Sequence, residues 1–333
     1  MLSLWPPGFR RIPPEDWTTQ PVERLAIGYD TVEHHGWYRN LEPTLRQLET
    51  VLQEGDLLLD YSGGTGILAS RLLERLPALR FGILIVDSSP KFLRLAMEKL
   101  GQEERVAFRR IRFLKGRHRL QRVDEILDPS LLRRGTDVLV STNAIHLYYD
   151  LPATLASWAR VLKPGGMVHV QSGNIRNPAA AAGERIIDET VEAIHREAMR
   201  IVRREPAYAS YREILENPRR LAAYETLRTK YFLPVRTLQE YIDLLEKAGF
   251  TALETSHATM EARVSEWREF LGVYHEGVLG WVGGAEKIEG RPASAAATRT
   301  RLELLGRAME TVFGGRPTFK ACWTYITCHS ASC

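Results

Sequence analysis

Apolar residues alternate between two periods along the middle of the chain. Short apolar runs predict strands at 57–60, 82–87, 106–114, 137–142 and 167–173. Residues at helical spacing predict helices between them, at 66–76, 90–100, near 122–134 and at 151–162. A regular strand–helix alternation predicts a doubly wound α/β fold, in which helices cover both faces of a mostly parallel sheet.

Two segments interrupt this alternation. A charged, helical stretch at 183–230 precedes a helix at 237–250 and a strand at 251–257, and residues 261–316 separate that strand from a last one at 319–328. These strands raise the expected total to seven. We therefore divide the chain into an N-terminal helical cap (1–54), a core (55–257, with a helical insertion at 174–236), and a lid insertion with a closing strand (258–333).

The first strand of the core ends in a glycine-rich turn, Asp60-Tyr61-Ser62-Gly63-Gly64-Thr65-Gly66. Glycines let main-chain N–H groups approach a ligand, and the following helix adds a partial positive charge. Gly64, Gly66 and Ala69 formally satisfy G-x-G-x-x-A, so a nicotinamide or flavin enzyme is a competing interpretation. The acid at the strand end favours a ligand with an amino group, because a carboxylate repels a pyrophosphate.

Later turns carry further signals, ARVLKPGGMVHVQ (159–171) and EKAGF (246–250). With the glycine loop they make residues 55–257 resemble the class I S-adenosylmethionine-dependent methyltransferases, in particular the small-molecule branch of ubiquinone/menaquinone C-methyltransferase-like enzymes. The resemblance implies a Rossmann-like seven-stranded sheet and S-adenosylmethionine as cofactor. It also implies the cofactor-binding residues Asp60, Tyr61, Ser62, Gly63, Gly64 and Gly66 beside the methionine part, Asp87 and Ser88 at the ribose, and Asn143.

The sequence departs from this family at two places. Tyr61-Ser62 replaces the more usual Gly-Cys, and Arg117 stands where many members carry an acid that holds the adenine amino group. Asp87 has a second interpretation as the cap of the helix that begins near Pro90.

Candidate catalytic residues follow the fourth strand and lie in the N-terminal cap. Within STNAIHLYYD (141–150), His146 is a candidate general base and Tyr148 a substrate-pocket residue. Tyr29 and His35 precede the core, where related enzymes fold a helix over the cofactor. A pocket wall or lid packing is the alternative for these residues, since methyl transfer often requires only proximity and alignment.

The aromatic segment 267–284 predicts an apolar lid over the acceptor, with Tyr274 and Trp281 as substrate residues. The alternative is a satellite core inside the second insertion. The lid hypothesis leads to methylation of a small, apolar or aromatic metabolite at oxygen or carbon.

Two alternative functions remain, and the charge distribution bears on the first. The net charge is +4 over 333 residues, but 105–122 holds eight Arg or Lys and no acid, which would suit an RNA or other nucleic-acid substrate. A nucleic-acid partner is disfavoured, because the fourth strand lacks the Asn/Asp-Pro-Pro-aromatic signature of amino-methylating enzymes. A non-catalytic S-adenosylmethionine-binding protein is the second rival.

Composition limits the remaining possibilities. Cys322, Cys328 and Cys333 have neither the spacing of metal ligands nor that of a disulfide framework, so we expect no metal. The chain starts without a secretory pattern and has no run of 18 apolar residues, so we expect a cytoplasmic protein with no membrane partner. A homodimer is compatible with the sequence.

Overall fold

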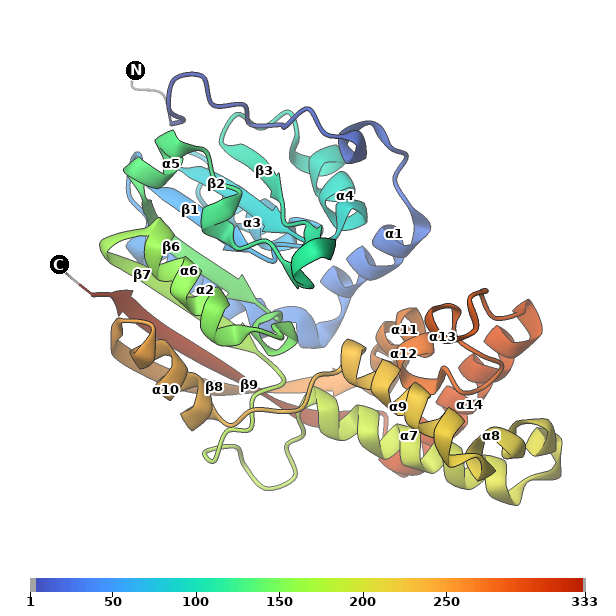
Figure 1. Cartoon of the computed structure of the whole chain (residues 1–333). Helices are drawn as coiled ribbons and strands as arrows, with labels where there is room; N and C mark the ends of the chain where they lie inside the picture. Colours follow the sequence, from blue (N-terminus) through green and yellow to red (C-terminus); the bar gives the residue numbers. More distant parts are fainter. Residues whose placement is uncertain (1–3, 332–333) are drawn as a thin grey trace.

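A computed structural model describes residues 4–331, and a seven-stranded sheet lies at its centre (Figure 1). The strand order is β3-β2-β1-β6-β7-β9-β8, with β9 antiparallel to both neighbours and the other pairs parallel. This topology confirms the predicted fold class. The strands are β1 Leu57–Tyr61, β2 Gly82–Asp87, β3 Val106–Arg110, β6 Thr136–Thr142, β7 Leu162–Ser172, β8 Phe250–Arg263 and β9 Thr318–Ser330.

Helices cover both faces because successive strand residues point to opposite sides of the sheet. Leu58 and Ile83 belong to the core under α2, α3 and α4, whereas Leu57 and Leu84 belong to the core under α5, α6 and α10. The bounds are α2 Leu41–Val51, α3 Ile67–Arg75, α4 Pro90–Leu100, α5 Pro129–Arg134, α6 Leu151–Val161 and α10 Leu238–Lys247.

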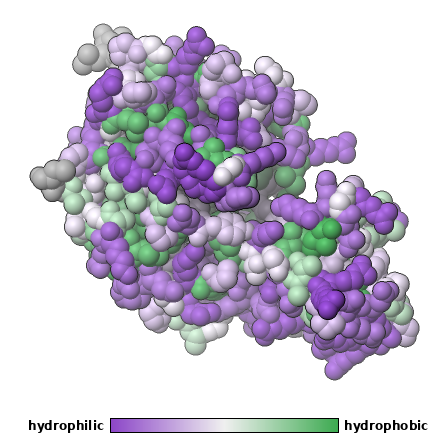
Figure 2. Space-filling view, viewed as in Figure 1, coloured by the Kyte–Doolittle hydropathy of each residue, from purple (hydrophilic) through white to green (hydrophobic). Residues whose placement is uncertain are grey.

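The two interrupting segments form a helical lobe beside the sheet (Figure 1). Helix α7 packs on α14 and α9 packs on α12, so segments from both sides of β8 share one interior. The surface is hollowed where this lobe meets the core (Figure 2). The bounds are α7 Ile187–Arg204, α8 Arg212–Glu216, α9 Pro218–Tyr231, α11 Val264–Val273, α12 His275–Leu279, α13 Glu286–Glu289 and α14 Ala295–Phe313.

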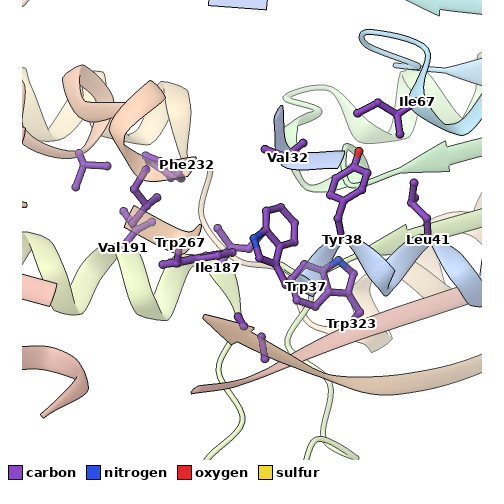
Figure 3. Packing of buried hydrophobic residues seen from close by; sticks show 14 of the residues in the cluster. Val32, Trp37, Tyr38, Leu41, Ile67, Ile187, Val191, Phe232, Trp267 and Trp323 are labelled. Atoms are coloured by element: carbon purple, nitrogen blue, oxygen red, sulfur yellow. The ribbon is translucent and has the colours of Figure 1, made fainter. Parts of the chain in front are cut away.

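Tryptophan packing joins the lobe to the sheet. Trp37 lies between Trp323 of β9 and Trp267 of α11, with ring centroids 5.7 Å and 5.4 Å away (Figure 3). All three are buried, and large aromatic residues dominate the energetics of such contacts. The N-terminal segment therefore holds the lobe against the sheet.

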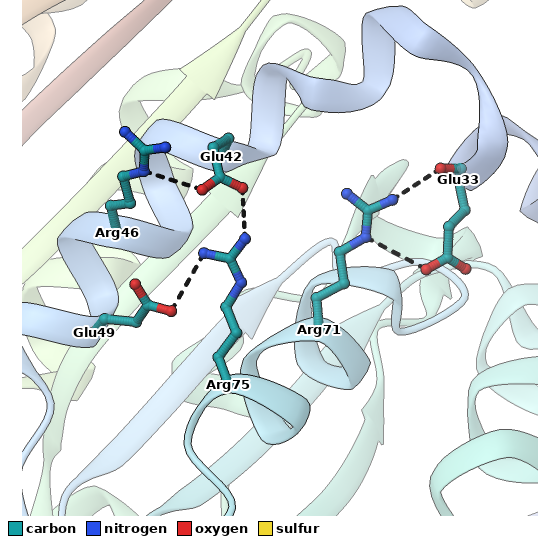
Figure 4. A network of polar contacts seen from close by, with 6 residues as sticks. All are labelled: Glu33, Glu42, Arg46, Glu49, Arg71 and Arg75. Carbon is teal, nitrogen blue, oxygen red and sulfur yellow. Dashed lines mark hydrogen bonds and ion pairs between the residues drawn. The ribbon is translucent and has the colours of Figure 1, made fainter.

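That N-terminal segment consists of α1 Arg24–Asp30, η2 Thr31–His34, η3 Gly36–Asn40 and α2. Leu41, Leu45 and Leu48 of α2 are fully buried, as their helical spacing predicts. Ion pairs connect this segment to α3, among them Arg71 with Glu33 (Figure 4). Partly exposed pairs contribute about 0–1 kcal/mol each, so leucine burial provides most of the attachment.

The predicted strand 106–114 and the helix near 122–134 are wrong in detail. β3 ends at Arg110, and a small hairpin follows, β4 Phe113–Leu114 with β5 Arg119–Leu120. The helix begins only at Pro129, because proline has no N–H to donate and favours the first helical position.

Three further observations complete the fold. The short 3-10 helices outside the N-terminal segment are η1 Asp16–Thr19, η4 Lys115–Arg117, η5 Val123–Glu125, η6 Ile145–Leu147 and η7 Pro206–Tyr211. Cys322 and Cys328 are buried free thiols, and Cys333 lies outside the described residues. No helix within residues 4–331 combines the length and apolar character needed to cross a bilayer.

Candidate functional site

The glycine loop connects β1 to α3 and turns sharply. Ser62, Gly64 and Gly66 have φ values of 64°, 57° and 79°, a region that favours glycine. A Cβ on Gly63 would lie 2.6 Å from Asp60 Oδ2, so no larger residue fits there without movement. The loop is a turn whose main chain passes close to a carboxylate.

Asp60 carries the least compensated charge of the site. It is completely buried, and neither carboxylate oxygen has a hydrogen-bond partner among the described residues. Burial raises its pKa to about 7, and the charge of Asp87 adds to this effect. Since buried polar groups are normally paired, the carboxylate fits a cationic donor from a ligand, such as an amino group.

Asp87 ends β2 and is held by the glycine loop. Its Oδ2 accepts a hydrogen bond from the Gly64 N–H at 2.9 Å, and its Oδ1 accepts one from the Ser89 N–H at 2.7 Å. Burial raises the pKa of Asp87, and main-chain N–H groups oppose the rise. The N-cap of α4 is Ser89, whose Oγ accepts from Phe92 N, so Asp87 is not the cap itself. Ser88, beside them, is exposed.

Three tyrosines lie near these two carboxylates. The ring of Tyr29 stacks on Phe92 at 4.8 Å and meets Tyr274 edge-on at 6.4 Å. Burial and the charge of Asp87 raise the pKa of Tyr29 to about 12, which a hydrogen bond with Tyr38 opposes. Burial and the charges of Tyr29 and Asp87 also hold the pKa of Tyr274 well above its usual value. The structure therefore brings Tyr29, from the N-terminal segment, and Tyr274, from the second insertion, to one place.

The other predicted lid residue, Trp281, lies elsewhere. Its ring meets His195 of α7 edge-on at 6.3 Å, and it is buried in the interior of the helical lobe. This placement favours the satellite-core interpretation for Trp281.

Tyr61 and Tyr148 support the glycine loop from the opposite core. The ring of Tyr61 packs edge-on against Tyr148 and Trp158, in the core on the other face of the sheet. The Tyr148 hydroxyl donates to Ser62 Oγ at 2.9 Å. The departure from Gly-Cys thus places an aromatic side chain in the core beneath the loop.

His146 is bound within the protein. Its Nδ1 lies 2.8 Å from Ser172 Oγ, which itself accepts from the Asn174 N–H. Nδ1 is therefore engaged with the hydroxyl, as donor or as acceptor according to the ring tautomer. Burial, with the charge of Arg236, lowers the pKa of His146 to about 4. The ring is neutral at pH 7 and its Nδ1 is occupied by Ser172.

Asn143 also uses its side chain internally. Its Oδ1 accepts from Trp323 Nε1 at 2.8 Å, and its Nδ2 lies 3.4 Å from Asn40 Oδ1. Its φ of 54° leaves a turn at the carboxyl end of β6. These two side-chain contacts hold the turn, so only the main chain of Asn143 is left to contact a ligand.

His35 has a different environment from His146. It is buried, its Nε2 lies 3.2 Å from Glu269 Oε2, and its Nδ1 has no partner among residues 4–331. Because the carboxylate accepts the Nε2 proton, the free Nδ1 carries a lone pair. No sequence pattern signals Glu269, since it lies in the second insertion, 234 residues from His35.

The basic run 105–122 is largely compensated. Five of its arginines pair with acids outside the run: Arg105 with Glu103, Arg109 with Asp128, Arg112 with Glu15, and both Arg117 and Arg119 with Glu125. Arg117, predicted near the adenine, is 70% exposed in the turn of the β4–β5 hairpin. The run is weaker as a nucleic-acid surface than its composition suggests.

One family model matches part of this chain. Residues 59–168 match the model described as a methyltransferase domain, whereas no curated protein sequence matches the chain. A Haemonchus contortus phosphoethanolamine N-methyltransferase 2 is 13% identical (TM-score 0.49), and the match covers 92% of this chain and 57% of that one. An S-adenosylmethionine-dependent methyltransferase from Thiobacillus denitrificans is 14% identical (TM-score 0.49), with coverage of 93% and 100%.

A third solved structure is similar to the same extent. It is a putative sarcosine dimethylglycine methyltransferase from Galdieria sulphuraria, 15% identical (TM-score 0.48), with coverage of 88% and 86%. The residues that match the family model include Asp60, the glycine loop and Asp87. The methyltransferase-domain model thus matches the part of the chain that holds the glycine loop and both buried carboxylates.

Proposed function

We propose that this protein is an S-adenosylmethionine-dependent methyltransferase that acts on a small, apolar or aromatic metabolite, at oxygen or carbon. The observation that carries the proposal is the convergence of Tyr29 and Tyr274 near the buried carboxylate of Asp87 and the glycine loop. Sites with large aromatic walls and few placed polar groups bind small apolar ligands. We place the acceptor beside these two rings, one from the N-terminal segment and one from the second insertion.

The residues present fit the cofactor. The unpaired Asp60 carboxylate matches the amino group of its methionine part, and Asp87 matches the ribose hydroxyls, since carboxylates accept two hydrogen bonds at once. When bound, the cofactor supplies an electrophilic methyl group on a sulfonium. The protein positions the acceptor and excludes water from it.

In this proposal His35 is the general base. An acceptor hydroxyl loses a proton as it attacks, and we assign that proton to His35 Nδ1, which is buried and has no hydrogen-bond partner among the described residues. Glu269, at Nε2, fixes the orientation of the ring. His146 is the weaker candidate, because its Nδ1 is engaged with Ser172.

Turnover with isotopically labelled S-adenosylmethionine over a panel of phenolic and other apolar metabolites tests the proposal. Once an acceptor is found, His35→Gln is expected to lower kcat by about 100-fold or more, the usual contribution of a general base, with cofactor affinity unchanged. His34→Gln is the matched control, because His34 is adjacent but less buried.

Three outcomes contradict the proposal. Equal rates in His35→Gln and the control would remove His35 from catalysis. Turnover on RNA but on no metabolite would support the nucleic-acid alternative. Cofactor binding without any turnover would support a binding protein.

A further inference from the structure

The last strand of the sheet has an open edge. β8 lies at the end of the sheet opposite β3, and within residues 4–331 its only strand neighbour is β9 (Figure 1). Its second half is largely exposed, including Thr255, His257, Thr259, Glu261 and Arg263. Unpaired main-chain groups along such an edge are a template for another strand.

The pairing with β9 determines which residues face outward. Val264 N donates to Pro317 O while Arg263 is paired with Thr318, so even-numbered residues of this half direct their N–H and C=O groups to β9. The odd-numbered ones therefore direct theirs to the open edge. No other described segment makes a main-chain hydrogen bond to these outward groups.

Edge strands usually carry features that prevent pairing, such as proline, lysine or a bulge. β8 has an irregularity between Thr251 and Glu254, next to Ala252 with a φ of 51°. Residues 255–263 contain neither proline nor lysine, and their register with β9 is regular. The protection thus covers only the first part of the strand.

We propose that β8 pairs with β8 of a second copy of this chain, antiparallel, about a two-fold axis through Thr259. In an antiparallel ladder, hydrogen-bonded pairs direct their main-chain groups at each other and alternate with non-hydrogen-bonded pairs, so odd residues lie opposite odd ones and even residues opposite even ones. With the axis at Thr259, His257 of each copy faces Glu261 of the other. The imidazole and the carboxylate are complementary, and the contact is isologous, as a two-fold dimer requires.

Neighbouring registers are less favourable. An axis through His257 places the two His257 side chains opposite each other. An axis through Ala258 leaves Glu261 opposite Thr255, and one through Met260 places His257 opposite Arg263. At the chosen register Ala258 also meets Met260 of the second copy on the face toward η3, which adds apolar contact.

A cavity adjoins this half of β8. Its volume is about 500 Å³, and strand addition combines main-chain hydrogen bonds with side-chain pockets. The Thr259 hydroxyl is bonded to Glu184, so the contact at the axis is made by the main chain. The residues that line the cavity include His34, Arg39, Thr259, Met260, Glu261 and Arg263.

Sedimentation equilibrium of the full chain tests the dimer. The wild type is expected at twice the chain mass of 37.9 kDa at micromolar concentration. Thr259→Pro removes an outward N–H without touching the β9 ladder, and is expected to raise the dimer dissociation constant at least 10-fold. Circular dichroism and cofactor affinity, expected unchanged, verify that the variant is folded.

A charge exchange tests the register. Glu261→Lys and His257→Glu are each expected to weaken the dimer, and the double variant is expected to restore it. Glu213→Lys, 83% exposed on α8, is the control for the change in net charge. A monomeric wild type, a dimer unaffected by Thr259→Pro, or a double variant weaker than both single ones would overturn the proposal. None of these readouts depends on methyl transfer.

Discussion

Replacing Asp60 with asparagine separates the stability of the empty protein from its affinity for the cofactor. Burial and the Asp87 charge raise the pKa of Asp60 from 3.8 to about 7. The unfolded chain keeps the ordinary value, so between about pH 4 and pH 7 the folded state holds a proton that the unfolded state has released. The free energy of unfolding therefore falls as the pH rises through this window.

The magnitude follows from the two pKa values. A difference of about three pH units corresponds to a destabilisation of about 4 kcal/mol, present in full above pH 7 and absent below about pH 4. About 3 kcal/mol of this change lies between pH 5 and pH 8. An asparagine side chain cannot ionise, so the Asp60→Asn protein lacks this pH dependence.

The assay is urea unfolding of both proteins at pH 5 and pH 8 without cofactor. The stability of Asp60→Asn relative to wild type is expected to be about 3 kcal/mol more favourable at pH 8 than at pH 5. Calorimetry at pH 8 is expected to show S-adenosylmethionine bound about 1.5–3 kcal/mol more weakly, because a hydrogen bond to a charged acceptor is lost. If the free energy of unfolding depended on pH equally in the two proteins, the raised pKa of Asp60 would be refuted. If Asp60→Asn bound S-adenosylmethionine as tightly as the wild type, the contact of Asp60 with the amino group would be refuted.

Two further predictions concern the ribose contact and the lid. Asp87→Ala is expected to weaken cofactor binding by about 1.5–3 kcal/mol in calorimetry, since Asp87 also orients Gly64; an unchanged dissociation constant in the folded variant would exclude this role. Trp281→Ala is expected to lower the free energy of unfolding by about 3–5 kcal/mol and to leave turnover per folded molecule unchanged. Tyr274→Ala is expected to reduce turnover. If Trp281→Ala instead reduced turnover and Tyr274→Ala did not, Trp281 would lie at the acceptor.

Local patterns predict most of the sheet because its strands are short apolar runs with turn residues between them. They do not predict the hairpin after β3, because Arg112, Phe113 and Leu114 continue the strand pattern. β3 ends at Arg110 because its pairing with β2 ends there. The irregular start of β8 likewise depends on its partner β9.

The part of the candidate site that neighbouring strands contribute is predictable from the sequence. Asp60, the glycine loop and Asp87 follow consecutive strands, so their proximity follows from the parallel topology. The pairing of His35 with Glu269 and the separation of Tyr274 from Trp281 depend on how the insertions pack. No periodicity in the sequence encodes that packing, and only the three-dimensional arrangement distinguishes His35 from His146.

The strand order has a consequence for how the chain folds during synthesis. β9 lies between β7 and β8 but follows both in sequence, and the helices α11–α14 precede it. On a ribosome, β1 to β7 can assemble as they emerge, whereas β8 leaves the exit tunnel without its neighbour. It stays unpaired on both edges until residues 318–330 are made. The last strand therefore completes the sheet in one late step, the non-local kind of contact that slows folding and exposes nascent strands to aggregation.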